Sequence, residues 1–258
     1  MERLAELLFI LASMDRLTLL SEIHNMRLKS SHLTSKLSAT PQETSKHLMC
    51  LRNAKLIEKD SEGFFGLTTF GKNVVNLVPS FVFHAQNREY FLSHDISSLP
   101  LEFIERLGEM QKAEHVDNVG SVFAHLQQVV QSAEKYIWLM ADHRLGNQEY
   151  VTKSGRLDIN SMMTWRVILP ANSNINWAEV RKSAGIHKGR IEYRMIDDSE
   201  NIKIGIVMNE KISEVVFPDT VGKIDFNGGF RSDNALFHQW CKDLFIYHWT
   251  MKERSVEI

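Results

Sequence analysis

The chain has little cysteine, no long apolar run and almost no net charge, and each of these shortages excludes some classes of protein. Only two cysteines, Cys50 and Cys241, occur in 258 residues, so a disulfide framework is excluded. The longest apolar runs, such as 7–12 and 136–141, are far too short to span a bilayer. No apolar segment headed by Lys or Arg opens the chain, so no secretion signal is expected. The sequence predicts a cytoplasmic protein without a membrane partner.

The motifs of common catalytic sites are missing too. The chain has no glycine-rich phosphate loop, no Gly-x-Ser-x-Gly elbow and no His-Glu-x-x-His. Two His-x-x-Cys pairs, His47 with Cys50 and His238 with Cys241, offer two ligands each. A closed metal site needs about four ligands, so ordinary helix residues are the better interpretation. The sequence therefore predicts no catalytic residue, no metal and no cofactor, and a protein that is not an enzyme.

The net charge is -2, but the basic residues are concentrated in one stretch near the start of the chain. Within it, only Glu43 and Glu58 oppose the lysines and arginines, while the rest of the chain is mildly acidic. A local basic patch is enough to attract phosphates, even on a neutral protein. The basic residues are Arg27, Lys29, Lys36, Lys46, Arg52, Lys55 and Lys59.

The region 31–67 has the pattern of a winged helix-turn-helix. Residues 31–37 form a short apolar-faced helix, and Thr40-Pro41-Gln42-Glu43 then has the N-cap, proline and capping glutamate of a helix start. Residues 56–60 and 64–67 favour strands, and 61–63 favour a turn. Two short helices followed by a hairpin predict a recognition helix with a wing.

Exposed residues of this recognition helix and wing are the expected contacts to double-stranded DNA. Gln42 and Ser45 lie near the start of the helix, where short polar side chains reach base edges in the major groove. Lys46, Arg52 and Lys59 are expected on phosphates, which set the register. The full expected set is Pro41, Gln42, Glu43, Ser45, Lys46, Met49, Arg52 and Lys59.

The second half of the chain alternates between strand-like and helical segments. A junction is expected at 77–87, with Pro79 as a breaker, followed by helices at 101–110 and 119–134. Such alternation predicts a layered α/β domain, so the chain as a whole is α+β. The expected domains are 1–78, which binds DNA, and 79–258, which senses an effector and dimerises. Strands are expected at 136–141, 165–169, 191–196, 202–208 and 214–217, and further helices at 177–184 and 232–252.

Three segments carry a resemblance to a known family. The segment "TPQETSKHLMCLRNAKLI", followed by "FFGLTTFGK", resembles ArsR-type and archaeal winged-helix regulators. The segments "NREYFLSHDISSLPLEFIERLGEM" and "KIDFNGGFRSDNALFHQWCKDLFIYHW" resemble the middle domain and the ending of archaeal methanogenesis-regulator-type transcription factors. The resemblance implies a transcriptional regulator whose second domain senses a ligand and is distantly related to the phospholipase D fold. The catalytic His-x-Lys of that fold is absent at His143-Arg144 and at His187-Lys188.

A small-molecule effector is expected near the ends of two predicted strands. Asp142, His143 and Arg144 follow the strand 136–141, and Arg166 lies in the next strand. Ligands of open α/β sheets bind at the carboxyl ends of strands, although a solvated loop with local ion pairs is the alternative interpretation. Four aromatic residues are expected to pack in the core, with a pocket lining as the alternative. They are Trp138, Trp165, Phe217 and Trp240.

The predicted regulator is a homodimer that reads a palindromic site. One recognition helix reads only a few base pairs, whereas two helices about 34 Å apart read two half-sites. Either the first helix or the last could form the two-fold contact. Two other functions stay open: a winged-helix scaffold for protein interactions, and a phospholipase D-like enzyme with a DNA-targeting domain. The apolar residues offered are Leu4, Leu7, Leu8 and Leu11 in the first helix, and Phe237, Trp240, Leu244 and Phe245 in the last.

Overall fold

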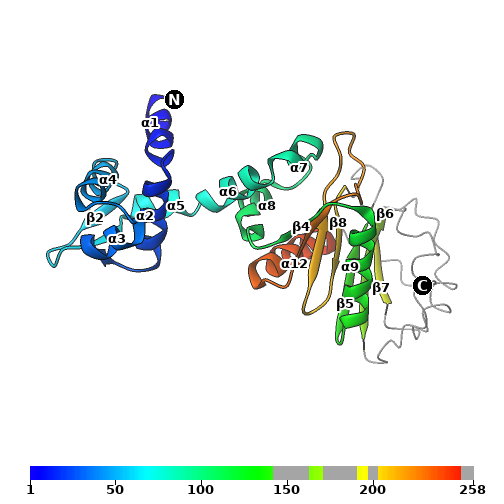
Figure 1. Ribbon diagram of the computed structural model, residues 1–258. Coiled ribbons are helices and arrows are strands. Elements are labelled where there is room, and N and C mark those ends of the chain that lie inside the picture. The colour runs from blue at the N-terminus through cyan, green and yellow to red at the C-terminus, as the bar shows by residue number, and fades with distance from the viewer. Residues whose placement is uncertain (142–162, 171–190, 197–202, 251–258) are drawn as a thin grey trace. The chain divides into compact units, whose positions relative to one another are not determined.

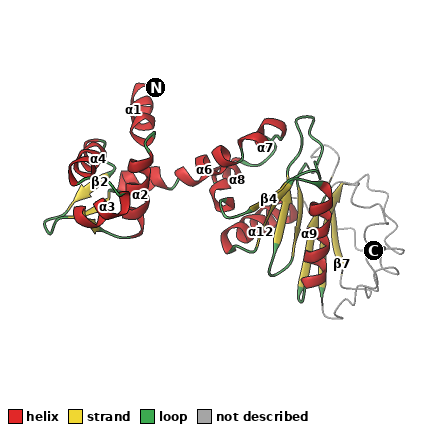
Figure 2. Ribbon diagram, viewed as in Figure 1, coloured by secondary structure: helices red, strands yellow, loops and turns green. Residues whose placement is uncertain are grey.

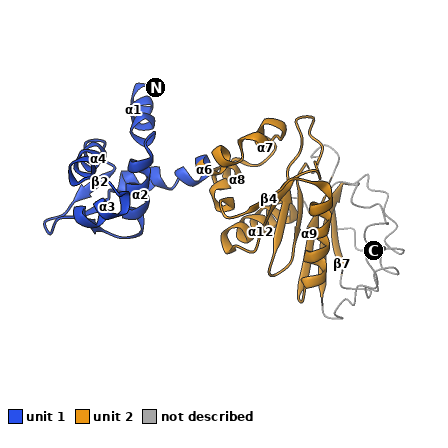
Figure 3. Cartoon of the chain, viewed as in Figure 1, with its two compact units in different colours: residues 1–81 blue, residues 82–258 orange. Residues whose placement is uncertain are grey.

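A computed structural model of the chain describes residues 1–141, 163–170, 191–196 and 203–250. The chain divides into two compact units, Met1–Phe81 (unit 1) and Val82–Ile258 (unit 2) (Figure 3). Both units contain helices and strands, so the chain is α+β (Figure 2). The division falls inside helix α6, Val78–Gln86, where the sequence predicted a break at Pro79. Pro79 does not break this helix, because it lies in the first turn, where a missing N–H leaves no hydrogen bond unmade, but the division itself lies within the junction expected at 77–87.

Unit 1 has the element order of a winged helix-turn-helix (Figure 1). Strand β3 lies between β1 and β2 and is antiparallel to both. The tight turn between α3 and α4 uses Ser38, whose φ of 50° is the left-handed end of α3. The helices are α1 Glu2–Leu11, α2 Met14–Asn25, α3 Ser30–Leu37, α4 Pro41–Asn53 and α5 Thr69–Val75, and the strands are β1 Leu28–Lys29, β2 Ile57–Lys59 and β3 Phe64–Leu67.

The core of unit 1 is built from leucines at helical spacing, as the sequence predicted. Leu48 and Leu51 lie on the inner face of α4, next to the fully buried Thr44. They pack against α2, α3 and the hairpin. Because this packing uses one face of α4, the opposite face is left at the surface. The buried apolar residues are Leu19, Leu20, Ile23, Leu33, Leu48, Leu51, Leu56, Ile57, Phe65 and Leu67.

A tight corner fixes where α4 ends and the hairpin begins. Lys55 has a φ of 61°, in the left-handed region, and its N–H donates to the Arg52 carbonyl at 2.9 Å. Thr68, the N-cap of α5, donates its hydroxyl to the Lys55 carbonyl at 2.6 Å. A Cβ on Gly71 would lie 1.9 Å from the Leu56 carbonyl oxygen, so α5 approaches this corner as closely as glycine permits.

Unit 2 is built around a seven-stranded sheet in the order β4-β10-β9-β8-β5-β6-β7. The strands β5, β6 and β7 are parallel, and the other pairs are antiparallel. The first described strand of unit 2, β4, therefore pairs with the last one, β10. The strands are β4 Glu114–Val116, β5 Tyr136–Met140, β6 Thr164–Pro170, β7 Ile191–Ile196, β8 Gly205–Met208, β9 Ser213–Val216 and β10 Gly229–Ser232.

Helices cover both faces of this sheet. Val122 of helix α9, Val119–Ser132, packs with Val216 on one face. The long helix α12, Ala235–Thr250, buries Phe237, Trp240, Leu244 and Phe245 on the other face, each at 0% exposed. The prediction that these four residues offer a dimer contact is wrong, because the core of unit 2 already uses them. Before the sheet come α7 Arg88–Ser93, α8 Leu101–Glu105 and the 3-10 helix η1 Leu107–Met110.

The predicted strands correspond to β5 through β9, with ends that differ by up to a few residues. The strands β4 and β10 were missed, and so was β1, because each is short and is defined by a distant partner. The expected helix 101–110 is divided at Arg106 into α8 and η1. The expected helix 177–184 lies outside the described residues.

Candidate functional site

Helix α4 begins with the capping box that the sequence predicted. The Thr40 hydroxyl accepts from the Glu43 N–H at 3.3 Å, and the Thr40 N–H donates to the Glu43 carboxylate at 2.9 Å. The Thr40 hydroxyl also donates to this carboxylate at 2.7 Å, and the two bonds that the carboxylate accepts, first the one from the Thr40 backbone, hold the pKa of Glu43 below its usual range. Glu43 is therefore occupied by the cap, and it fixes the position of the helix start that Gln42 and Ser45 share.

All eight residues expected at a DNA contact lie at the surface of unit 1. Met49, an apolar residue, is 59% exposed on the outer face of α4. His47, which the sequence offered as half of a metal pair, instead contacts Asp15 of α2 at 3.3 Å and fixes α4 against that helix. The exposed residues are Pro41, Gln42, Glu43, Ser45, Lys46, Met49, Arg52 and Lys59.

The ion pairs of unit 1 separate the basic stretch into neutralised and unpaired cations. Arg27 bridges Glu58 and Asp60 of the hairpin, at 3.4 and 3.0 Å. Lys36 contacts Glu22 at 3.3 Å. The remaining cations of α4 and the wing have no ion-pair partner among the described residues, so positive charge is left on this face. These cations are Lys46, Arg52, Lys55 and Lys59.

The wing is stiffened by a side-chain turn and by two lysines that lie over aromatic rings. The Asp60 carboxylate accepts from the Phe64 N–H at 2.9 Å, and this bond is the main reason why the pKa of Asp60 is lowered. The Lys59 ammonium lies 5.5 Å from the Phe65 ring centroid. The Lys29 ammonium lies 4.8 Å from the Phe64 ring centroid, which the sequence did not predict because β1 has only two residues.

The effector residues expected in unit 2 are only partly described. Asp142, His143 and Arg144 lie outside the described residues, as do His187 and Lys188. Arg166 lies on β6, and its Nε donates to the Glu192 carboxylate of β7 at 2.8 Å. It pairs with Trp138 in the middle of β5, not with Met140 at the carboxyl end. Ile168, which is opposite Met140, lies two positions further along β6 than Arg166 does. The expectation that Arg166 adjoins the carboxyl end of a strand is therefore wrong.

The four aromatic residues expected in the core are all buried. Trp138, Phe217 and Trp240 share one cluster with α12, and Trp165 belongs to a smaller cluster on the α9 side. The second His-x-x-Cys pair is part of the same interior. Cys241 is fully buried, which raises the pKa of its thiol, and the His238 ring hydrogen-bonds to the Asn209 carbonyl at 2.7 Å. The described residues contain no group of three metal-ligating side chains.

A row of charged side chains crosses the sheet on the face that α9 covers. Glu114, Arg231 and Glu214 are opposite one another on β4, β10 and β9. Arg231 contacts Glu114 at 3.4 Å, whereas neither carboxylate oxygen of Glu214 has a hydrogen-bond partner among the described residues. Burial raises the pKa of Glu214 to about 8, although Arg231 opposes the shift. Glu214 lines a cavity of about 20 Å³, room for about one water molecule.

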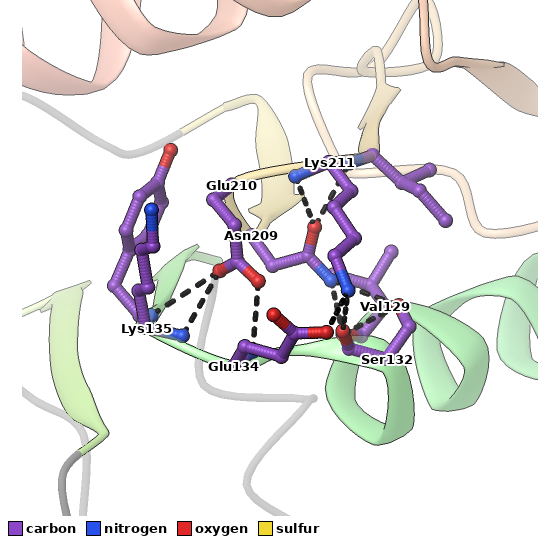
Figure 4. A network of polar contacts seen from close by, with 9 residues as sticks. Val129, Ser132, Glu134, Lys135, Asn209, Glu210 and Lys211 are labelled. Atoms are coloured by element: carbon purple, nitrogen blue, oxygen red, sulfur yellow. Dashed lines mark hydrogen bonds and ion pairs between the residues drawn. The ribbon is translucent and has the colours of Figure 1, made fainter.

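The turn between β8 and β9 forms a polar joint with the end of α9 (Figure 4). Asn209 is fully buried, and its amide donates to the Val129 carbonyl at 2.7 Å and to the Ser132 hydroxyl at 2.9 Å. Its side-chain oxygen accepts from the N–H groups of Lys211 and Ile212, at 2.7 and 2.8 Å. All four hydrogen-bonding positions of this amide are thus filled within the unit.

The carboxylate of Glu210 completes the joint. It accepts from three consecutive backbone N–H groups, those of Glu134, Lys135 and Tyr136, at 2.8, 3.2 and 3.4 Å. Burial alone would raise the pKa of Glu210, but its backbone hydrogen bonds lower it. The sequence did not predict this joint, because its two halves are about eighty residues apart.

No family model matches the chain, and no curated protein sequence matches it. Among solved structures, an archaeal chromatin protein, TrmBL2, is similar with 11% identity over 90% of this chain and 88% of its own, at a TM-score of 0.41. Reduced HlyU from Vibrio cholerae N16961 is 27% identical over 30% of this chain and 85% of its own, at a TM-score of 0.28.

Enzymes are also among the similar structures. RosA from Streptomyces davawensis, a riboflavin-derivative dimethyltransferase, is 15% identical over 75% of this chain and 64% of its own, at a TM-score of 0.28. Other methyltransferases match over a similar share of the chain. These likenesses contradict the prediction that the chain is not an enzyme. The prediction rested on missing side-chain motifs, which do not test for reactions whose chemistry a bound cofactor supplies. With TM-scores below 0.5, the likenesses assign no reaction and no partner.

No helix among the described residues is long and apolar enough to cross a membrane.

Proposed function

We propose that the chain is a transcriptional regulator whose unit 1 binds double-stranded DNA in a sequence-specific way. The observation that carries this proposal is the outer face of α4. That face combines short polar side chains at a capped helix start with cations that have no acidic partner among the described residues. Short polar groups suit base edges in the major groove, and unpaired cations suit phosphates.

Each part of the surface has a separate role in this proposal. Gln42 and Ser45 contact base edges, and Met49 can pack against a thymine methyl group. Lys46, Arg52 and Lys59 contact phosphates, while Pro41 and Glu43 fix the start of the helix. Arg27 stays bound to the acidic residues of the wing and holds the hairpin in place.

Salt-dependent binding tests the phosphate contacts. The affinity of the full chain for a mixed-sequence duplex is measured by fluorescence anisotropy over a salt series. Lys46→Ala and Arg52→Ala should each weaken binding and reduce the slope of log K against log salt by about one. Lys223→Ala, an exposed lysine of unit 2, is the matched control and should change neither quantity. Equal affinity and slope in all four proteins would refute the proposal.

Selection from a random duplex library tests the base contacts. The wild-type chain should enrich a defined sequence, and Gln42→Ala should relax the preference at one or two positions without changing the salt slope. Enrichment of no sequence would leave only general DNA affinity and would contradict a regulator of specific sites. Binding of protein partners through the same face, with no DNA affinity, would favour the scaffold function instead.

The proposed regulator is a homodimer that uses α1 and reads a palindromic operator. No residue of α1 is buried, although Leu7 and Leu11 pack against the core of unit 1. Leu4, Leu8 and Phe9 are 47%, 50% and 74% exposed. An apolar helix face that its own unit leaves uncovered suits a two-fold contact with a second copy.

Sedimentation at micromolar concentration measures the association. The wild-type chain should sediment as a dimer and Leu8→Glu as a monomer, while Glu6→Ala on the same helix should remain a dimer. A wild-type protein that sediments only at 29.8 kDa would contradict the dimer.

Unit 2 is the proposed effector-binding part of the regulator. A ligand would act by binding one placement of the two DNA-binding units better than another. A coupling free energy of roughly 1–3 kcal/mol would change operator affinity by about 5–150-fold. The likeness of unit 2 to the phospholipase D fold remains a prediction from the sequence.

A further inference from the structure

Two arginines of unit 2 lie on the same tryptophan ring. Arg166 of β6 and Arg194 of β7 come from neighbouring parallel strands, where Arg166 is opposite Glu192 and Arg194 is opposite Ile168. The guanidinium carbons lie 5.3 and 4.7 Å from the centroid of Trp249, near the end of α12. The two arginines project from the face of the sheet that α12 covers.

The two arginines are not equally neutralised. Arg166 donates its Nε to the Glu192 carboxylate at 2.8 Å and also lies 5.5 Å from the Trp138 ring. Arg194 has no carboxylate within ion-pair distance among the described residues. Among the described residues the cluster therefore has two cations and one anion, which leaves one positive charge without a counter-charge there, next to two largely buried indole rings.

The environment of this charge strengthens its attraction for an anion. Trp138 and Trp249 are only 8% and 9% exposed, so one side of each guanidinium faces a poorly hydrated surface. Charges on adjacent strands repel each other when they have the same sign, and a bound anion would relieve that repulsion. The rings also restrict the orientation of the guanidinium planes, so part of the entropy cost of binding is already met in the free protein.

We propose that Arg194, together with Arg166, binds the carboxylate or phosphate group of a small anionic ligand on the α12 face of unit 2. The planar fork of Arg194 matches two oxygens of such a group, and Trp249 holds that fork in place. The proposal names the chemical class of the effector. It rests on the proposed regulator only in that binding of the anion would change the affinity for DNA. Binding itself is tested without DNA.

Intrinsic fluorescence responds to the site, because two of the five tryptophans, Trp138 and Trp249, contact the arginines. The full chain is titrated at constant ionic strength with inorganic phosphate in one series and succinate in another. Saturable change in tryptophan emission is expected with at least one probe, and the stronger response distinguishes a phosphate from a carboxylate ligand. Arg194→Ala should weaken that binding by about tenfold or more, since a charge-assisted hydrogen bond is lost.

Two further variants separate the site from general effects of charge. Arg88→Ala removes an exposed arginine of the same unit and should leave the titration unchanged. Arg194→Lys keeps the charge and the fold but loses the planar fork, and it should bind severalfold more weakly than the wild type. A wild-type chain that responds to neither probe would overturn the proposal. The proposal would also fail if Arg194→Lys and Arg194→Ala both bound the probe as tightly as the wild type does. Loss of DNA binding, by contrast, would leave these titrations intact.

Discussion

The two units place their polar side chains in opposite ways. The core of unit 1 is apolar apart from Thr44, and this unit places its cations and short polar groups on the outside of α4 and the wing. Unit 2 encloses an amide, Asn209, and a carboxyl group, Glu214, between its sheet and α9. A buried polar group requires partners or a shifted pKa, whereas an exposed one requires neither. Substitutions of polar residues should therefore change binding in unit 1 and stability in unit 2.

The strongest test of the comparison is a substitution that unfolds one unit alone. In Gly71→Ala, the new Cβ would meet the Leu56 carbonyl oxygen at 1.9 Å, so the corner between α4 and α5 must open. We expect a loss of about 4 kcal/mol from the stability of unit 1. All five tryptophans follow residue 81, so their emission reports unit 2 while circular dichroism reports both units.

The two readouts should separate in this variant. The helical signal should melt in part at a lower temperature, while the tryptophan transition stays where it is in the wild type. Asn73→Ala, an exposed position on the same helix, is the control and should leave both transitions unchanged. A common shift of both transitions would mean that the units unfold together.

The joint at Asn209 should have the next largest effect, and in the other unit. In Asn209→Ala, four hydrogen bonds disappear and the N–H groups of Lys211 and Ile212 lose their acceptor. The expected loss is about 3 kcal/mol, measured by denaturant unfolding with tryptophan emission. Asn227→Ala, which removes an exposed amide, should cost much less, and equal losses in the two variants would refute the role of the joint.

The buried carboxyl group makes the stability of unit 2 depend on pH. The pKa of Glu214 is raised from 4.5 to about 8 in the folded unit. The unfolded chain therefore ionises first, and stability falls as pH rises through this window, by about 1 kcal/mol per pH unit. The charged group that opposes this shift is Arg231, which is opposite Glu214 on β10 and also contacts Glu114 on β4.

The neutral variant removes this dependence. Glu214→Gln should flatten the stability profile of unit 2 between pH 5 and 8, whereas Glu102→Gln, an exposed control, should keep the wild-type slope. Denaturant unfolding at several pH values, followed by tryptophan emission, provides the profile. A slope that Glu214→Gln leaves intact would assign the pH dependence to another group.

The smallest effect concerns the single strained residue at the end of α4. Lys55 has a left-handed φ of 61°, which glycine adopts at lower cost, so Lys55→Gly should stabilise unit 1 by about 1 kcal/mol. Lys55→Ala removes the same charge but keeps the strain, and it is the matched control. Thermal melts followed by circular dichroism compare Lys55→Gly with Lys55→Ala, and the difference in their stability is the cost of the left-handed backbone at this position. Equal stability of the two variants would contradict the predicted strain.

Local signals made unit 1 the easier half to predict. The capping box at Thr40 and Glu43 and the turn residues of the hairpin fix their own conformations within a few residues, so the winged helix and its exposed face follow from the sequence. In unit 2, the pairing of Arg166 with Trp138 depends on strand register, and the partner of Asn209 is about eighty residues away. No local pattern encodes such neighbours, so the row at Glu214, the joint at Asn209 and the arginines on Trp249 were all missed.

The pairing of β4 with β10 has a consequence for the order in which the chain folds during synthesis. The Ser232 hydroxyl donates to the Lys112 carbonyl, 120 residues earlier in the chain, so β4 meets its neighbour β10 only after most of unit 2 has left the ribosome. At roughly 5–20 residues per second, β4 waits on the order of ten seconds for its partner. The contacts of unit 1 lie within its first 81 residues, so it can fold during that delay. A nascent chain would thus carry a finished winged helix before the unit proposed to regulate it exists.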